Sequence, residues 1–195
     1  MIAVVERLLA LLALFAVGIS VGGLVLLARR RVPEWLASQV ALPLAAAIAV
    51  VATAGSLFAS EVAGYPPCVL CWYQRAAMYP LALLLTVAAV RSSQRVWRIA
   101  VPVAAIGAGI AGWHIGVERL PGAPDAVCDP EAPCSVLWIN EFGFLTLPTM
   151  ALIGFLAIIV LVLLARTGAR RHPAPPGGEG SSATTSATSD PTPPA

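Results

Sequence analysis

Residues 142–165 read FGFLTLPTMALIGFLAIIVLVLLA, a long apolar run without a charged side chain. A bilayer core of about 30 Å is crossed by about 20 helical residues. Only helices and closed barrels can cross it, because every backbone polar group must be satisfied internally. The run lacks the apolar–polar alternation of a strand, so it predicts a transmembrane helix.

Four more apolar runs come earlier, at residues 8–28, 35–60, 71–90 and 99–117, of which the third is interrupted by Arg75 and the fourth contains His114. We therefore expect an all-α integral membrane protein with five transmembrane helices. The first run could instead be a cleaved signal peptide, whose apolar segment usually has about 7–15 residues. This run is longer, and its arginines follow it rather than precede it. We interpret it as a retained helix.

The composition agrees with a membrane protein. Hydrophobic residues make up 58% of the 195-residue chain and charged residues 11%, and the mean hydropathy is +0.84. Soluble domains carry about 45–50% apolar and about 25% charged residues. A soluble enzyme and a nucleic-acid-binding protein are both unfavoured. The net charge of +2 identifies no partner.

The arginines predict the orientation, because short cytoplasmic loops are enriched in Lys and Arg. Arginines gather at 29–31, 91–98 and 166–171. The other connections hold the acidic residues Glu61, Glu118, Asp125, Asp129, Glu131 and Glu141. The pattern predicts an N-terminus outside the cytoplasm and a C-terminus inside. Residues 173–195 are rich in Pro, Gly, Ser and Thr, which predicts a disordered cytoplasmic tail.

Both cysteine pairs fall in the predicted outer loops, where an oxidising environment lets disulfides persist. Cys128 and Cys134 could form a structural disulfide or a redox-active one. Cys68 and Cys71 form a Cys-x-x-Cys motif, whose bridge closes so small a loop that it stabilises little. A redox couple is therefore favoured for this pair. A zinc site is unfavoured, because structural zinc usually joins two short knuckles within a compact module, so we predict no metal.

The residues after the first pair suggest how it could react. Pro66 and Pro67 stop any preceding helix, so Cys71 is expected at or beside a helix N-terminus, where a thiolate is stabilised. Arg75 lies one turn further on the same face and could donate hydrogen bonds to a carbonyl-bearing ligand. It could also simply reach the lipid headgroups. Gln74 is its neighbour, and His114 is either interfacial or in contact with a ligand.

Residues 64–80, GYPPCVLCWYQRAAMYP, resemble the DsbB/BdbC family of bacterial quinone-linked thiol oxidoreductases. Residues 134–148, CSVLWINEFGFLTLP, look like that family's entry into its last helix. The resemblance implies a four-helix transmembrane bundle over 35–165. Residues 1–34 would then be an extra N-terminal helix with its Arg loop, and 166–195 a cytoplasmic tail.

The resemblance also implies a function in a bacterial cytoplasmic (inner) membrane. Cys68 and Cys71 would pass electrons to quinone, either ubiquinone or menaquinone, from the membrane pool. Arg75 would assist quinone binding, with Gln74 and His114 as further candidates. Cys128 and Cys134 would oxidise a DsbA-like thioredoxin-fold partner, with Cys128 forming the mixed disulfide.

Three features depart from the family pattern: the extra helix, the tail, and the gap of only five residues between Cys128 and Cys134. Two other hypotheses stay open. A vitamin K epoxide reductase-like enzyme also uses quinone, but its loop cysteines precede its Cys-x-x-Cys. A non-catalytic membrane protein with loop disulfides would not need Arg75 beside Cys71. The apolar segment 135–144 could lie on the membrane surface or serve as a simple anchor.

Overall fold

The computed structural model describes residues 1–120, 128 and 133–171, and five of its helices are long and apolar enough to cross a membrane. Four are continuous: α1 (Ile2–Ala28), α3 (Val69–Val90), α4 (Trp97–Arg119) and α5 (Leu147–Arg171). The remaining span consists of α2 (Ala41–Leu57) between the π-helical turns η1 (Leu36–Val40) and η2 (Phe58–Val62). A short 3-10 turn, η3 (Gln94–Val96), leads into α4. The described residues contain no strand, so the predicted all-α membrane fold is confirmed.

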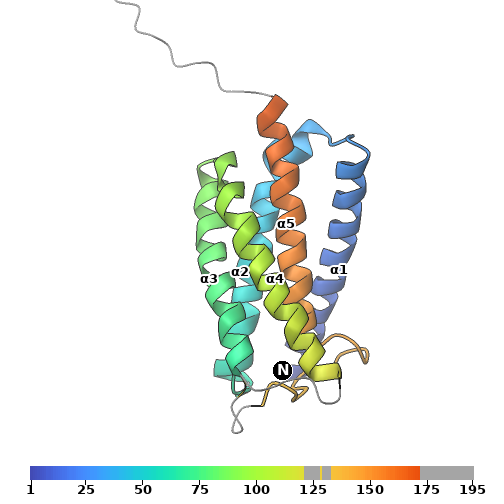
Figure 1. The fold of residues 1–195 in the computed structure, drawn as a ribbon, viewed down its shortest axis with the longest axis vertical. Helices are drawn as coiled ribbons and strands as arrows, with labels where there is room; N and C mark the ends of the chain where they lie inside the picture. Colours follow the sequence, from blue (N-terminus) through green and yellow to red (C-terminus); the bar gives the residue numbers. More distant parts are fainter. Residues whose placement is uncertain (121–127, 129–132, 172–195) are drawn as a thin grey trace, which may run out of the picture.

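Successive helices run in opposite directions, so the connections alternate between the two ends of the bundle (Figure 1). The N-terminus, the link from α2 to α3 and the link from α4 to α5 share one end. Both cysteine pairs therefore meet there, and the arginine-rich connections lie at the other end. The acidic residues Asp125, Asp129 and Glu131 and the tail predicted over 173–195 lie outside the described residues.

The last helix begins later than its apolar run. α5 starts at Leu147, whereas the sequence predicted a start at residue 142. Phe142 and Gly143 have φ angles of 55° and 78°, which no right-handed helix contains. Glu141 and Leu145 instead pair with each other through two backbone hydrogen bonds. The apolar segment before α5 is therefore a turn, in which Ile139 is buried and its neighbour Trp138 is 42% exposed.

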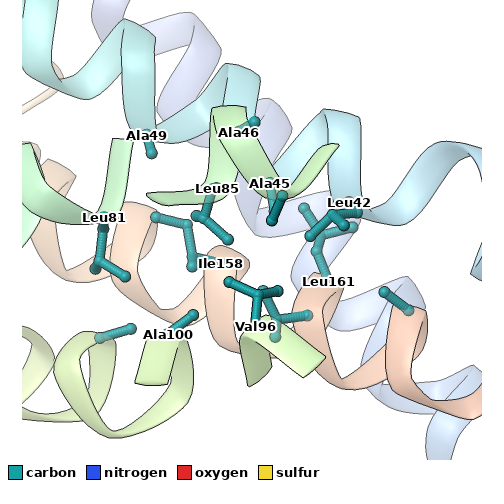
Figure 2. Packing of buried hydrophobic residues seen from close by; sticks show 14 of the residues in the cluster. Leu42, Ala45, Ala46, Ala49, Leu81, Leu85, Val96, Ala100, Ile158 and Leu161 are labelled. Carbon is teal, nitrogen blue, oxygen red and sulfur yellow. The ribbon is translucent and has the colours of Figure 1, made fainter. Parts of the chain in front are cut away.

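The core lies between α2, α3, α4 and α5 (Figure 2). α2 and α4 contribute mainly alanines, and α3 and α5 contribute larger side chains such as Leu81, Leu85, Ile158 and Leu161. In a membrane, helices associate through close packing rather than through exclusion of water, so small residues at the contact favour association. α1 lies outside this core and packs along α5 (Figure 1).

Gly107 of α4 faces the ring of Phe155 of α5, which is completely buried. A methyl group at Gly107 would overlap that ring. Gly109, two residues along the same helix, has nothing within 4 Å of the corresponding position. Comparing alanine at Gly107 with alanine at Gly109 therefore separates the cost of the clash from the general effect of alanine on a helix.

We expect Gly107→Ala to destabilise the bundle by about 1–3 kcal/mol relative to Gly109→Ala, because overpacking forces the Phe155 ring or the helix to shift. Unfolding of both variants in mixed detergent micelles measures the difference. Equal unfolding midpoints would contradict this close contact between α4 and α5.

Candidate active site

Cys68 and Cys71 lie at the start of α3. The Pro66–Pro67 pair keeps the preceding chain out of the helix, and Cys68 occupies the N-cap with an extended backbone. The Cys68 sulfur accepts a hydrogen bond from the backbone N–H of Cys71 at 3.3 Å, and the two sulfurs are 2.9 Å apart. Both cysteines are free thiols in this structure. The predicted position of the motif at a helix N-terminus is confirmed.

The helix N-terminus favours the thiolate of Cys68. The hydrogen bond from the Cys71 thiol, helped by bonds from His114 and the Cys71 backbone, lowers the pKa of Cys68 to about 4 against the opposing effect of burial. The sequence placed the stabilised thiolate on Cys71. The structure differs because the cap position, which receives the unpaired N–H groups of the first turn, belongs to Cys68.

His114 of α4 connects the pair to two other parts of the site. Its Nε2 lies 3.1 Å from the carbonyl oxygen of Cys134 and 3.7 Å from the sulfur of Cys68. A carbonyl can only accept, so Nε2 carries the hydrogen. The other ring nitrogen, Nδ1, then accepts from the side-chain amide of Gln74 at 3.0 Å. The imidazole is only 3% exposed, so these bonds fix its orientation.

The second pair forms a disulfide, Cys128–Cys134, with its α-carbons 5.8 Å apart. The Cys134 sulfur, the Cys68 sulfur and a ring nitrogen of His114 all lie within 4.8 Å of one another. Three such atoms could in principle hold a metal ion. Here the sulfur of Cys134 is bonded to that of Cys128, so the Cys68 thiol lies close to one sulfur of the loop disulfide.

Arg75 is held from α2. Its Nε and Nη2 groups donate to the hydroxyl and the carbonyl oxygen of Ser56, each at 2.9 Å. The guanidinium also lies 5.3 Å from the ring centre of Trp72. Its Nη1 group donates to no atom of the described residues, so it remains available to a ligand. Arg75 is 9% exposed and does not extend freely toward headgroups.

A cavity of about 320 Å³ lies between α1, α2, α3 and α5. Cys71, Gln74, Arg75 and His114 contribute polar groups to its wall, and most of the rest is aliphatic or aromatic. Cys68 and Cys71 both line a smaller space of about 20 Å³ together with Glu118 and Cys134. Of the pair, Cys71 also lines the large cavity, so it borders both spaces.

The structure brings all seven residues singled out in the sequence near one another. His114 joins both cysteine pairs rather than sitting at the interface. Ser56 was missed altogether, because a serine within an apolar run carries no signal of its own. Only the packing of α2 against α3 brings it to Arg75.

The family model described as "Disulfide bond formation protein DsbB" matches residues 37–165. A "Probable disulfide formation protein C 1" of Bacillus cereus is 45% identical over 112 residues, 56% of this chain and 80% of the relative. "Disulfide bond formation protein C" of Bacillus subtilis is 42% identical over 120 residues, 61% of this chain and 87% of the relative. A "Probable disulfide formation protein" of Metapseudomonas resinovorans is 40% identical over 123 residues, 61% and 84% of the two chains. No solved structure matches the chain.

The pKa of Cys68 can be measured from the pH dependence of its alkylation. Because its pKa is lowered to about 4, the thiolate persists from neutral pH down to mildly acidic pH, where an ordinary thiol with a pKa of about 8.5 is protonated. Cys71→Ala removes the strongest hydrogen-bond donor, so the alkylation midpoint should rise. Cys71→Ser keeps a donor and should leave the midpoint low. Identical midpoints in the wild type and both variants would contradict the conclusion that the Cys71 thiol lowers the pKa of Cys68.

Proposed function

The chain belongs to the DsbB family of disulfide bond formation proteins, and we propose that it reoxidises a DsbA-like thioredoxin-fold partner and passes the electrons to membrane quinone. Cys128 and Cys134 would receive electrons from the partner, and Cys68 and Cys71 would deliver them. The observation that carries the proposal is that the first pair reaches both the loop disulfide and the large cavity. Cys68 lies against Cys134, and Cys71 lines the large cavity.

The first exchange would take place with the partner. A thiolate of the partner attacks Cys128 and breaks the Cys128–Cys134 bond, so that Cys134 leaves as a thiolate. The partner's second thiol then attacks the mixed disulfide and releases Cys128. The partner leaves with a disulfide, and both loop cysteines are reduced. Two electrons and two protons have moved to the loop pair.

The second exchange would take place within the chain. The Cys134 thiolate attacks the sulfur of Cys68 in an oxidised Cys68–Cys71 pair, and Cys71 leaves. Cys128 then attacks Cys134, restores the loop disulfide and releases Cys68. The structure, with a loop disulfide and two free thiols on α3, corresponds to the state after this exchange. The hydrogen at His114 Nε2 and the helix N-terminus both favour release of Cys68 as a thiolate.

The large cavity fits a quinone. Ligand sites of about 300–1,000 Å³ are mostly apolar with a few placed polar groups, and this cavity has that character. A bound quinone would accept two electrons and two protons as the Cys68–Cys71 disulfide forms. Arg75, held by Ser56, would direct its Nη1 donors to a quinone oxygen. Gln74 and His114 would contribute polar contacts beside it.

The proposed setting is a bacterial cytoplasmic membrane, with the N-terminus and both cysteine pairs outside. The order of the pairs, Cys-x-x-Cys first, disfavours a vitamin K epoxide reductase-like enzyme. The approach of Cys68 to Cys134 disfavours a non-catalytic protein with inert loop disulfides, because such a protein gains nothing from a thiol placed at a disulfide.

The exchange route predicts which cysteines can join. With Cys71→Ser and Cys128→Ser combined, Cys68 and Cys134 are the cysteines that remain, and mild oxidation should link them rapidly. The matched control combines Cys68→Ser with Cys128→Ser and leaves Cys71 and Cys134, which should link more slowly. Mass spectrometry after alkylation identifies the bridges. Equal rates in the two double variants would argue against Cys68 as the acceptor.

Quinone reduction tests the whole proposal. Protein reconstituted in lipid, with a reduced DsbA-like partner and ubiquinone or menaquinone, should reduce quinone catalytically, as followed by its absorbance. Cys71→Ser and Cys128→Ser should each abolish turnover, because each removes one half of a pair. Ser38→Ala, at the opposite end of the bundle, should not. Failure of folded wild-type protein with both quinone classes would refute the proposed function.

A further inference from the structure

α1 lies outside the family match, which begins at residue 37, yet it forms part of the wall of the large cavity. Its lining residues are all in its N-terminal two thirds: Leu9, Leu12, Ala13, Phe15, Ala16 and Ile19. The spacing of Leu9, Leu12, Ala13 and Ala16 is that of one helix face. A single apolar stripe of α1 is therefore directed at the cavity, and its other side faces outward from the bundle.

Three contacts hold α1 against the bundle. Towards its C-terminus, Gly23 fits so closely to α5 that a methyl group there would lie 2.6 Å from Cγ1 of Val160. Nearer its N-terminus, Leu9 packs against Gly55 of α2, where a methyl group would lie 3.1 Å from the leucine. Small residues at such contacts let helices in a membrane approach closely. α1 thus reaches α2 and α5, two of the helices that border the cavity.

The third contact joins the start of α1 to the segment before the Cys-x-x-Cys motif. The hydroxyl of Tyr65 donates to the carboxylate of Glu6 at 2.7 Å. The Tyr65 ring stacks on Trp138, with ring centres 5.4 Å apart. Tyr65 and Trp138 both line the cavity. The N-terminal end of α1 is therefore fastened beside the redox-active cysteines.

We propose that α1 closes the quinone cavity, with the apolar tail of the quinone lying along the Leu9–Ile19 stripe and the head group at Cys71 and Arg75. This inference rests on the proposed function. The polar groups of the cavity wall all come from outside α1, among them Arg75 of α3 and His114 of α4, whereas α1 offers apolar side chains only. A four-helix bundle without α1 would leave this side of the cavity open to lipid.

Photo-crosslinking tests the position of the tail without requiring turnover. A quinone carrying a photoreactive group on its tail is added to the full-length protein in lipid vesicles, and the labelled peptides are identified by mass spectrometry. We expect label within residues 9–19, and excess unlabelled quinone should remove it. Label confined to other helices would overturn the inference. Label at 9–19 that excess quinone does not remove would instead assign this face to a lipid acyl chain, and would also overturn it.

The KM for quinone in two variants of α1 tests whether this helix closes the cavity. Ala13 lines the cavity, and its neighbour Leu14 does not and is 39% exposed. Ala13→Trp should fill the space for the tail and raise the KM for quinone about tenfold, equivalent to about 1.4 kcal/mol. Leu14→Trp adds the same side chain on the outer face and should leave the KM unchanged. In both variants, reduction of Cys128–Cys134 by the partner should keep its wild-type rate.

The outcomes separate this inference from the proposed function. Quinone turnover by the wild type with equal KM values in the Ala13→Trp and Leu14→Trp proteins would overturn the role of α1 and leave the proposed function intact. Absence of turnover in folded wild-type protein, together with absence of quinone crosslinking anywhere, would refute both the role of α1 and the proposed function. Loss of partner exchange in the Ala13→Trp protein would mean that α1 supports the cysteine site rather than the cavity.

Discussion

The buried imidazole of His114 is the group around which the site is arranged. A polar ring that is 3% exposed must find hydrogen-bond partners, because leaving it unpaired in an apolar bundle is costly. Its two nitrogens find them on different elements, Gln74 of α3 and the backbone of Cys134. The ring therefore ties α3, α4 and the segment before α5 together. The sulfur of Cys68 comes within reach of Cys134 because both contact this one ring.

From this anchor the two cysteines of α3 acquire different neighbours. Cys68, at the N-cap, and Cys71, in the first turn, both line the small space beside the loop disulfide, and Cys71 also lines the large cavity. The thiol pair therefore connects the loop disulfide with an apolar cavity. Ser56 adds to this by holding Arg75 at the cavity wall instead of leaving it to reach solvent.

α1 lies outside the residues that match the family model, yet it lines the same cavity as Cys71 and Arg75. Its close contacts at Gly23 and Gly55, and the Glu6–Tyr65 hydrogen bond, place it over the cavity rather than at a distance from the bundle. Helices in a membrane need such close packing to associate. Gly23 and Gly55 lie at two of these close contacts.

The sequence by itself determined the five membrane spans, because apolar length reports directly on what a bilayer requires. It also determined that the Cys-x-x-Cys motif opens a helix, because two prolines precede it and an apolar run follows. Only the tertiary structure decided that Cys68 rather than Cys71 occupies the N-cap, that α5 starts after the turn at Phe142, and that Ser56 holds Arg75. It also decided the role of His114, whose partners Gln74 and Cys68 are 40 and 46 residues away in the chain. Such contacts depend on how helices pack and rotate against one another, which no local pattern of residues records.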